Sequence, residues 1–290
     1  MKKRIISIIL LLTMIISPAS VFATEATDDD IIVSLGADLS EERKQAILDE
    51  FDAPEDVKII YTTNEEEHNY LGGTIPAKQI GTNAISSVMI TFTQEGSGIK
   101  VDTSDKINYI TEENYINALI TAGVEDADIK VTAPVEASGT AALTGIFKAY
   151  EEKTGETIDE DVKKVANEEM VTNAELSDEV GDEAATEIIV KIKQEIADKA
   201  PETTEEVRQI IINVINNFDV TISDEMIDKL VSLFDKMKDV NINWDEVTNQ
   251  LEEFTGKVSD YLSSEEGQSF LEKVKDLFNR LIDWIGSLFD

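Results

Sequence analysis

The sequence contains no cysteine and only one histidine, His68, in 290 residues. Without cysteine the chain can form no disulfide, no thiolate metal site and no thiol nucleophile. One histidine cannot build a three-histidine zinc site, and a Ser-His-Asp triad would have to use His68. His68 lies among carboxylates in TTNEEEHNYLGG, and the G-x-S-x-G motif occurs nowhere in the chain. The composition therefore argues against histidine-dependent hydrolases and zinc enzymes.

Positive charge and aromatic rings are also scarce. The chain has 25 Lys and Arg against 60 Asp and Glu, a formal net charge of −35. Phosphate binding depends on Lys and Arg, so nucleic acid and anionic lipid are poor partners. Basic proteins, divalent cations or cationic envelope components suit the charge better, and the alternative is that it only keeps the protein in solution. Aromatic residues, at 6%, are too sparse to indicate a sugar-stacking cleft.

An apolar run long enough to suggest membrane insertion occurs only at the N-terminus, MKKRIISIILLLTMIISPASVFA. Its basic start, apolar centre and small-residue end predict a secretory signal peptide over residues 1–23, cleaved after Ala23. An uncleaved anchor would need a longer span. Cleavage removes three cations and no acids, which takes the formal charge from −35 to −38. We expect a secreted, extracellular product, either released or held non-covalently at the cell envelope, with no transmembrane segment after cleavage.

Two different patterns meet near residue 154. Before it, short β-like runs at 31–35, 57–63 and 128–134 alternate with helical patterns. The runs ISSVMITFTQ and IKVDTS, separated by Gly-Ser-Gly, predict a β-hairpin within residues 85–110. After residue 154 the spacing is almost entirely helical. The predicted class is α+β, with an α/β domain over 28–152 that contains a mixed sheet and a hairpin, and a helical bundle domain over 156–290.

The last part of the chain is amphipathic. Apolar residues spaced 4, 3, 4, 3 run from Val247 to Tyr261, the pattern of an antiparallel bundle helix. The final segment, 270–290, is apolar on one face, with acids and bases mixed on the other. It is expected to close the bundle, and the alternative is that it lies on a membrane surface.

Two long stretches carry a resemblance to a known family: YLGGTIPAKQIGTNAISSVMITFTQEGSGIKV and NALITAGVEDADIKVTAPVEASGTAALTGIFKAYE. In both, and in their order, the chain resembles the YpuA-like family, secreted proteins of Gram-positive Firmicutes with no established biochemical activity. The similarity covers most of the mature chain. It implies export and an α/β region followed by a helical region, and it supplies no catalytic residue.

The segment ASGTAALTGIFKAY, residues 137–150, has small residues before a predicted helix. This arrangement is typical of loops that bind a phosphate or hold a reactive serine. A Walker loop needs Gly-Lys-Ser/Thr, but Gly145 is followed by Ile146. We therefore predict a structural role, in which Ser138 or Thr140 caps a helix and Gly139 allows close packing or a positive φ.

Three weaker motifs were considered. Ser97 and Lys100 match S-x-x-K, and residues 153–155 match K-T-G, but Ser97 lies in a predicted turn and Lys153 ends a predicted helix. Asp239, Asn241 and Asn243 match the first positions of a calcium loop. Trp244 and Gln250 replace its glycine and its bidentate glutamate, which favours a polar loop between helices.

The sequence thus indicates no catalytic, cofactor-binding or metal-binding residue, and no cofactor. We expect an exported, acidic, non-catalytic protein that binds or organises a cell-envelope component or protein. The alternatives are a carboxylate-dependent hydrolase of envelope glycans and a weakly calcium-responsive protein.

Overall fold

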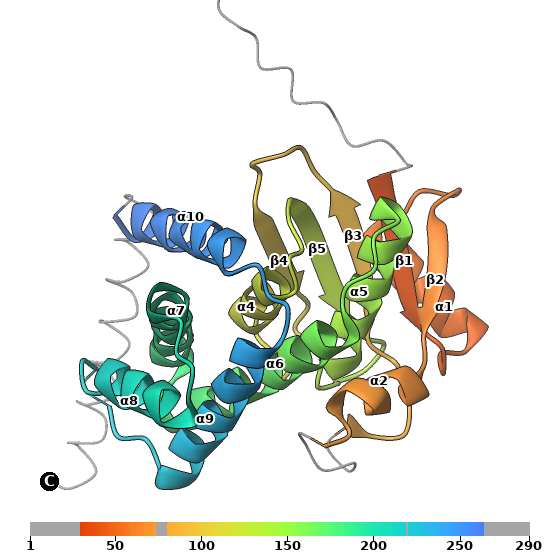
Figure 1. Ribbon diagram of the computed structural model, residues 1–290. Helices are drawn as coiled ribbons and strands as arrows, with labels where there is room; N and C mark the ends of the chain where they lie inside the picture. The colour runs from red at the N-terminus through yellow and green to blue at the C-terminus, as the bar shows by residue number, and fades with distance from the viewer. Residues whose placement is uncertain (1–29, 74–79, 219, 264–290) are drawn as a thin grey trace, which may run out of the picture.

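The computed structural model describes residues 30–73, 80–218 and 220–263, the last eight without side chains. The predicted signal peptide and the terminal segment 270–290 lie outside these ranges. A five-stranded sheet comes first in the chain and packed helices follow, which confirms the predicted α+β class (Figure 1). The elements are β1 (Ile31–Gly36), α1 (Glu41–Phe51), β2 (Lys58–Thr62), α2 (Asn64–Leu71), β3 (Ser87–Phe92), β4 (Ile99–Thr103), α4 (Glu112–Thr121), β5 (Ala127–Thr132), α5 (Thr140–Thr154), α6 (Glu160–Val180), α7 (Asp182–Lys199), α8 (Thr204–Ile215), α9 (Asp224–Asp239) and α10 (Trp244–Ser263).

The sheet is mixed, as predicted, with the order β2-β1-β3-β5-β4. The predicted hairpin is wrong, because β5 lies between β3 and β4. Ile129 of β5 pairs with Ile90 of β3 on one side and with Val101 of β4 on the other. The Gly-Ser-Gly turn at residues 96–98 does reverse the chain between β3 and β4. A turn motif does not predict whether a third strand lies between the two strands that it joins. β5, ADIKVT, takes the place between them, with Ala127, Ile129 and Val131 buried on one face and Asp128 and Lys130 exposed on the other.

Helices cover the two faces of the sheet unequally. Val33, Leu35 and Met89 face α1, whereas Ile32, Ile90 and Ile129 face α4 and α5. The connections β1-α1-β2 and β4-α4-β5 are both parallel and step the same way across the sheet. Because their helices lie on opposite faces, the two connections have opposite hands. One of them therefore departs from the right-handed rule.

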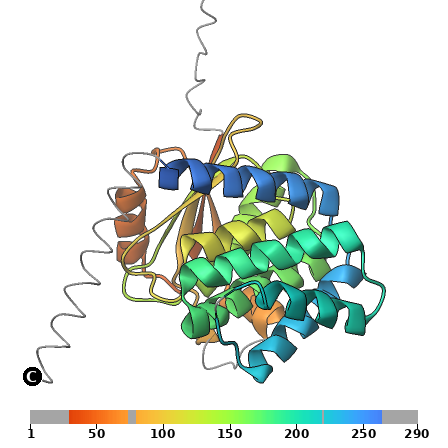
Figure 2. The same cartoon turned by 90° about the vertical axis from the view of Figure 1, so that its left-hand side faces the viewer.

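Helices α6 to α10 continue from the α4 side of the sheet, and α4, α7 and α10 lie side by side (Figure 2). The described residues from 205 to 263 contain no strand. One apolar cluster extends from Ile32 in β1 to Leu251 in α10. It crosses the predicted domain boundary at residues 152–156, where α5 ends and Gly155 turns the chain with a φ of 72°. The division into two domains stays a prediction.

Candidate functional site

Two acidic grooves lie at opposite ends of α4. We call the first the N-groove, a hollow of about 430 Å³ between the start of α4 and the end of α6. Its carboxylates are Glu112, Glu113, Asp178 and Asp182, and no Lys or Arg occurs among its described lining residues. Glu112 accepts a hydrogen bond from the Thr103 amide at 3.0 Å.

Tyr109, the aromatic residue of the N-groove, has a raised pKa. Burial, and then the carboxylates of Glu175 and Asp178, raise the pKa of Tyr109 to about 12. The phenol therefore stays neutral at physiological pH and can donate a hydrogen bond. A groove with these groups suits a cationic ligand that also accepts a hydrogen bond.

The second hollow, the C-groove, measures about 570 Å³ and lies between the end of α4, the start of α6 and the α9–α10 loop. Asp159, Glu160 and Glu246 line it, again with no Lys or Arg among the described lining residues. Glu160 is partly neutralised by Lys163, at 2.8 Å. Close by, burial and then the charges of Glu246 and other carboxylates raise the pKa of Glu125. Acidic side chains thus crowd this end of α4 as well.

An ion pair is fully buried between the two grooves. Lys193 Nζ of α7 lies 2.6 Å from Glu169 Oε1 of α6, and both side chains are 0% exposed. Lys193 also donates to the Asn117 carbonyl of α4 at 2.7 Å, and the Thr121 hydroxyl donates to Glu169 Oε2 at 2.5 Å. Burial raises the pKa of Glu169 and lowers that of Lys193, because each charged form loses its hydration. The pair joins three helices and is closed to solvent.

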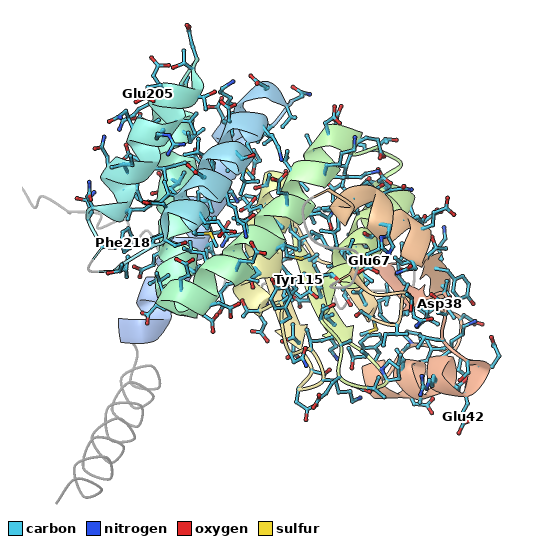
Figure 3. All side chains as sticks on the ribbon, turned by 90° about the horizontal axis from the view of Figure 1, so that it is seen from below. Asp38, Glu42, Glu67, Tyr115, Glu205 and Phe218 are labelled. Carbon is cyan, nitrogen blue, oxygen red and sulfur yellow. The ribbon has the colours of Figure 1, made fainter. Side chains whose placement is uncertain are left out.

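A second buried carboxyl, Glu67 of α2, forms no ion pair with a Lys or Arg among the described residues. It accepts a hydrogen bond from the Thr140 hydroxyl at 2.5 Å, at the first residue of α5. Burial raises its pKa, and the hydroxyl bond opposes this only in part. Tyr115 of α4 donates to the Gly139 carbonyl at 2.6 Å. Glu67 and Tyr115 lie in the interior, whereas Glu42 and Glu205 lie on the outside (Figure 3).

The segment 137–150 is therefore part of the interior. Gly139 has a φ of 94°, and a Cβ built on it would lie 2.5 Å from Tyr115 Oη and 2.8 Å from Ile107 Cγ2. This confirms both close packing and a positive φ at Gly139. The predicted cap is wrong: Gly139 itself occupies the N-cap, and Ser138 Oγ lies 3.5 Å from the Thr140 nitrogen, the limit of a hydrogen bond. The N-cap of α5 has a positive φ, which favours glycine at that position. Ser138 therefore lies one residue before the N-cap.

The other candidate residues lie apart from one another. His68 Nε2 contacts the Gly81 carbonyl at 3.0 Å. Ser97 donates to the Gln94 carbonyl within the β3–β4 turn, and Lys153 pairs with Asp30 at 2.6 Å. The predicted polar loop between helices is confirmed over 240–243, where the Asn243 side chain accepts from the Glu246 amide at 3.3 Å.

The described residues offer little for covalent or metal chemistry. They contain no group of three or more His, Asp or Glu side chains placed to hold a metal ion. Neither of the buried carboxyls, Glu67 and Glu169, lines either groove. None of the helices in these parts of the chain is long and apolar enough to cross a bilayer.

The buried ion pair was not predicted from the sequence, although a signal exists. Lys193 falls between Ile189, Ile192 and Ile196, on the apolar face of its helix. A lone charge on such a face requires a buried partner. The sequence gives no means of choosing Glu169 among 60 acids.

Comparison with known proteins identifies the family of the chain. The family model described as Protein of unknown function (DUF1002) matches residues 35–254. The chain is 44% identical over 290 residues to "Uncharacterized protein YpuA" of Bacillus subtilis (strain 168), covering 100% of both chains. No solved structure matches. The resemblance seen in the sequence is confirmed, and the chain belongs to the DUF1002 family of proteins of unknown function.

Proposed function

We propose that this is an exported, non-catalytic protein that binds a positively charged partner at the cell envelope. The observation that carries the proposal is the pair of grooves at the ends of α4, where carboxylates line the walls and the described lining residues include no Lys or Arg. Each groove is large enough for a basic side chain or a small cationic group. Export is supported by residues 1–23, which carry the three parts of a signal peptide.

A pulldown from envelope extracts tests the binding proposal. The mature protein, immobilised through its C-terminus, should retain a basic component at low salt, and retention should fall as salt rises, because exposed charges are screened. A component retained equally at high salt would argue against an electrostatic partner. Turnover of an envelope glycan by the purified protein would favour the hydrolase alternative.

Export has its own test. Mass spectrometry of the protein recovered from culture medium and cell wall should give an N-terminus at Thr24. Recovery of the full-length chain from the cytoplasm would overturn this part of the proposal without affecting the chemistry of the grooves.

A further inference from the structure

Polar side chains form a buried row along three helices that pack together. On α4 the row consists of Asn114, Asn117 and Thr121, and on α6 of Glu169, Asn173 and Ser177. On α7 it consists of Thr186 and Lys193. Each set repeats every three, four or seven residues, the spacing that keeps side chains on one face of a helix.

The rows are in register across the helices. Thr121 bonds Glu169, and the two ends of α4 meet opposite ends of α6 in the two grooves, so these helices are antiparallel. One turn away from this bond, Asn117 comes opposite Asn173, and a further turn brings Asn114 opposite Ser177. On α7, Lys193 contacts Glu169, and Thr186, two turns away, comes level with Ser177. The row therefore forms one continuous seam.

The two ends of the seam differ in their polar contacts. Near the C-groove, Glu169 pairs with Lys193 and accepts a hydrogen bond from the Thr121 hydroxyl. Toward the N-groove, several buried atoms have no hydrogen-bond partner among the described residues: Asn114 Nδ2, both amide atoms of Asn117, both amide atoms of Asn173, Ser177 Oγ and Thr186 Oγ1. Asn114, Asn117 and Asn173 are each 0% exposed.

So many buried donors and acceptors on one seam require partners, because each lost its water on folding. The seam supplies both donors and acceptors, and a buried water needs two to four such groups. The seam runs from one groove toward the other, since Ser177 is a lining residue of the N-groove and Thr121 of the C-groove.

We propose that the seam between α4, α6 and α7 is an internal water-binding site, in which a file of ordered waters bridges Asn114, Asn117, Asn173, Ser177 and Thr186 and connects the N-groove to the ion pair. The ligand class is water, held by amide and hydroxyl groups. The waters hold α6 and α7 against α4 through polar bridges where apolar packing is interrupted. This site does not depend on the proposed function of the grooves.

The direct test is a crystal structure of the mature protein at a resolution that shows ordered waters. We expect water peaks within hydrogen-bonding distance of the Asn117 and Asn173 amides, continuing to Ser177. Direct amide-to-amide or amide-to-carbonyl bonds at these positions, with no water between them, would overturn the proposal.

Nuclear magnetic resonance gives an independent test in solution. The side-chain NH2 groups of Asn117 and Asn173 in the wild-type protein should show cross-peaks to water, and their absence would contradict the proposal. Asn173→Leu should remove the water cross-peaks of Asn117, whereas Leu233→Met, a buried change on α9, should keep them. If Asn173→Leu does not fold, the wild-type spectrum alone still decides.

Discussion

Two buried glutamates lie in different surroundings, Glu67 on α2 and Glu169 on α6. Glu169 faces Lys193 at 2.6 Å, and the pair joins α6, α7 and α4. Glu67 accepts hydrogen bonds from the Thr140 hydroxyl, at the start of α5, and from Asn64 Nδ2 at 3.5 Å, and none of its partners among the described residues is a Lys or Arg. Burial raises the pKa of both carboxyls. The difference is that a cation opposes the effect of burial at Glu169, whereas at Glu67 mainly hydrogen bonds from Thr140 and Asn64 oppose it.

The comparison shows that a buried carboxyl can be held in the fold by an ion pair or by neutral hydrogen-bond donors. Neither side chain lines a groove, and each connects separate elements of the fold. Removing the partner should therefore damage the Glu169 region much more than any change near Glu67, because an unpaired buried charge costs more than a lost hydroxyl bond.

The largest effect is expected from Lys193→Met, which leaves Glu169 buried without its cation. We expect a loss of about 3–5 kcal/mol in the free energy of unfolding, measured by denaturant titration at neutral pH. Adding Glu169→Leu should recover much of this loss. Lys229→Met breaks the more exposed pair with Glu175 and should cost about 0–1 kcal/mol. Equal losses for the two lysine variants would refute the importance of the buried pair.

The second-largest loss of stability is expected at Gly139, the residue before Thr140, whose hydroxyl bonds Glu67. Gly139→Val forces a side chain into Tyr115 Oη and Ile107 at a φ of 94°, and strain of this kind costs about 1–3 kcal/mol before any loss of packing. Gly155→Val is the matched control, because its φ of 72° is also positive but its Cβ would meet nothing within 4 Å. Thermal unfolding should show the larger loss for Gly139→Val. Similar losses would mean that backbone strain alone matters.

A smaller, pH-dependent effect is expected from Glu67→Gln. Because the folded-state pKa of Glu67 is raised, its contribution to stability is complete below the unfolded-state value, about 4.3. That contribution is lost as pH rises through the folded-state pKa. The variant should therefore gain stability relative to wild type as pH rises from 4 toward 8. Glu65→Gln, an exposed change on the same helix, should show little of this trend. A trend of opposite sign would show that Glu67 is stabilised as the anion.

The smallest effect is expected from Ser138→Ala. The N-cap position is Gly139, and Ser138 Oγ lies 3.5 Å from the Thr140 nitrogen, so the loss should be about 1 kcal/mol or less. Melting temperature and the phenotype of the gene should both be retained. A variant with wild-type melting temperature but no biological activity would instead assign Ser138 a role in chemistry or binding.

Local patterns predicted local features well. The β-like run at 31–35 became β1, and the small residues at 137–142 indicated the close approach at Gly139. The pairing of β5 between β3 and β4 was not predictable, because a turn signal describes a few residues and strand order depends on distant ones. For the same reason the grooves were missed: Glu113 and Asp178 are far apart in the chain and meet only because α4 and α6 are antiparallel.

The most direct test of the central claim, that the grooves bind a cationic partner, is a comparison of two variants of equal charge. Glu113→Gln, Asp178→Asn and Asp182→Asn together remove three of the four carboxylates that line the N-groove, whereas Glu42→Gln, Glu55→Gln and Asp56→Asn remove the same charge from exposed positions elsewhere. Retention of the envelope component should be weakened by the groove variant and kept by the control. Equal retention by both variants, or equal loss, would contradict a site in the N-groove and leave the C-groove or the overall negative charge as the cause of binding.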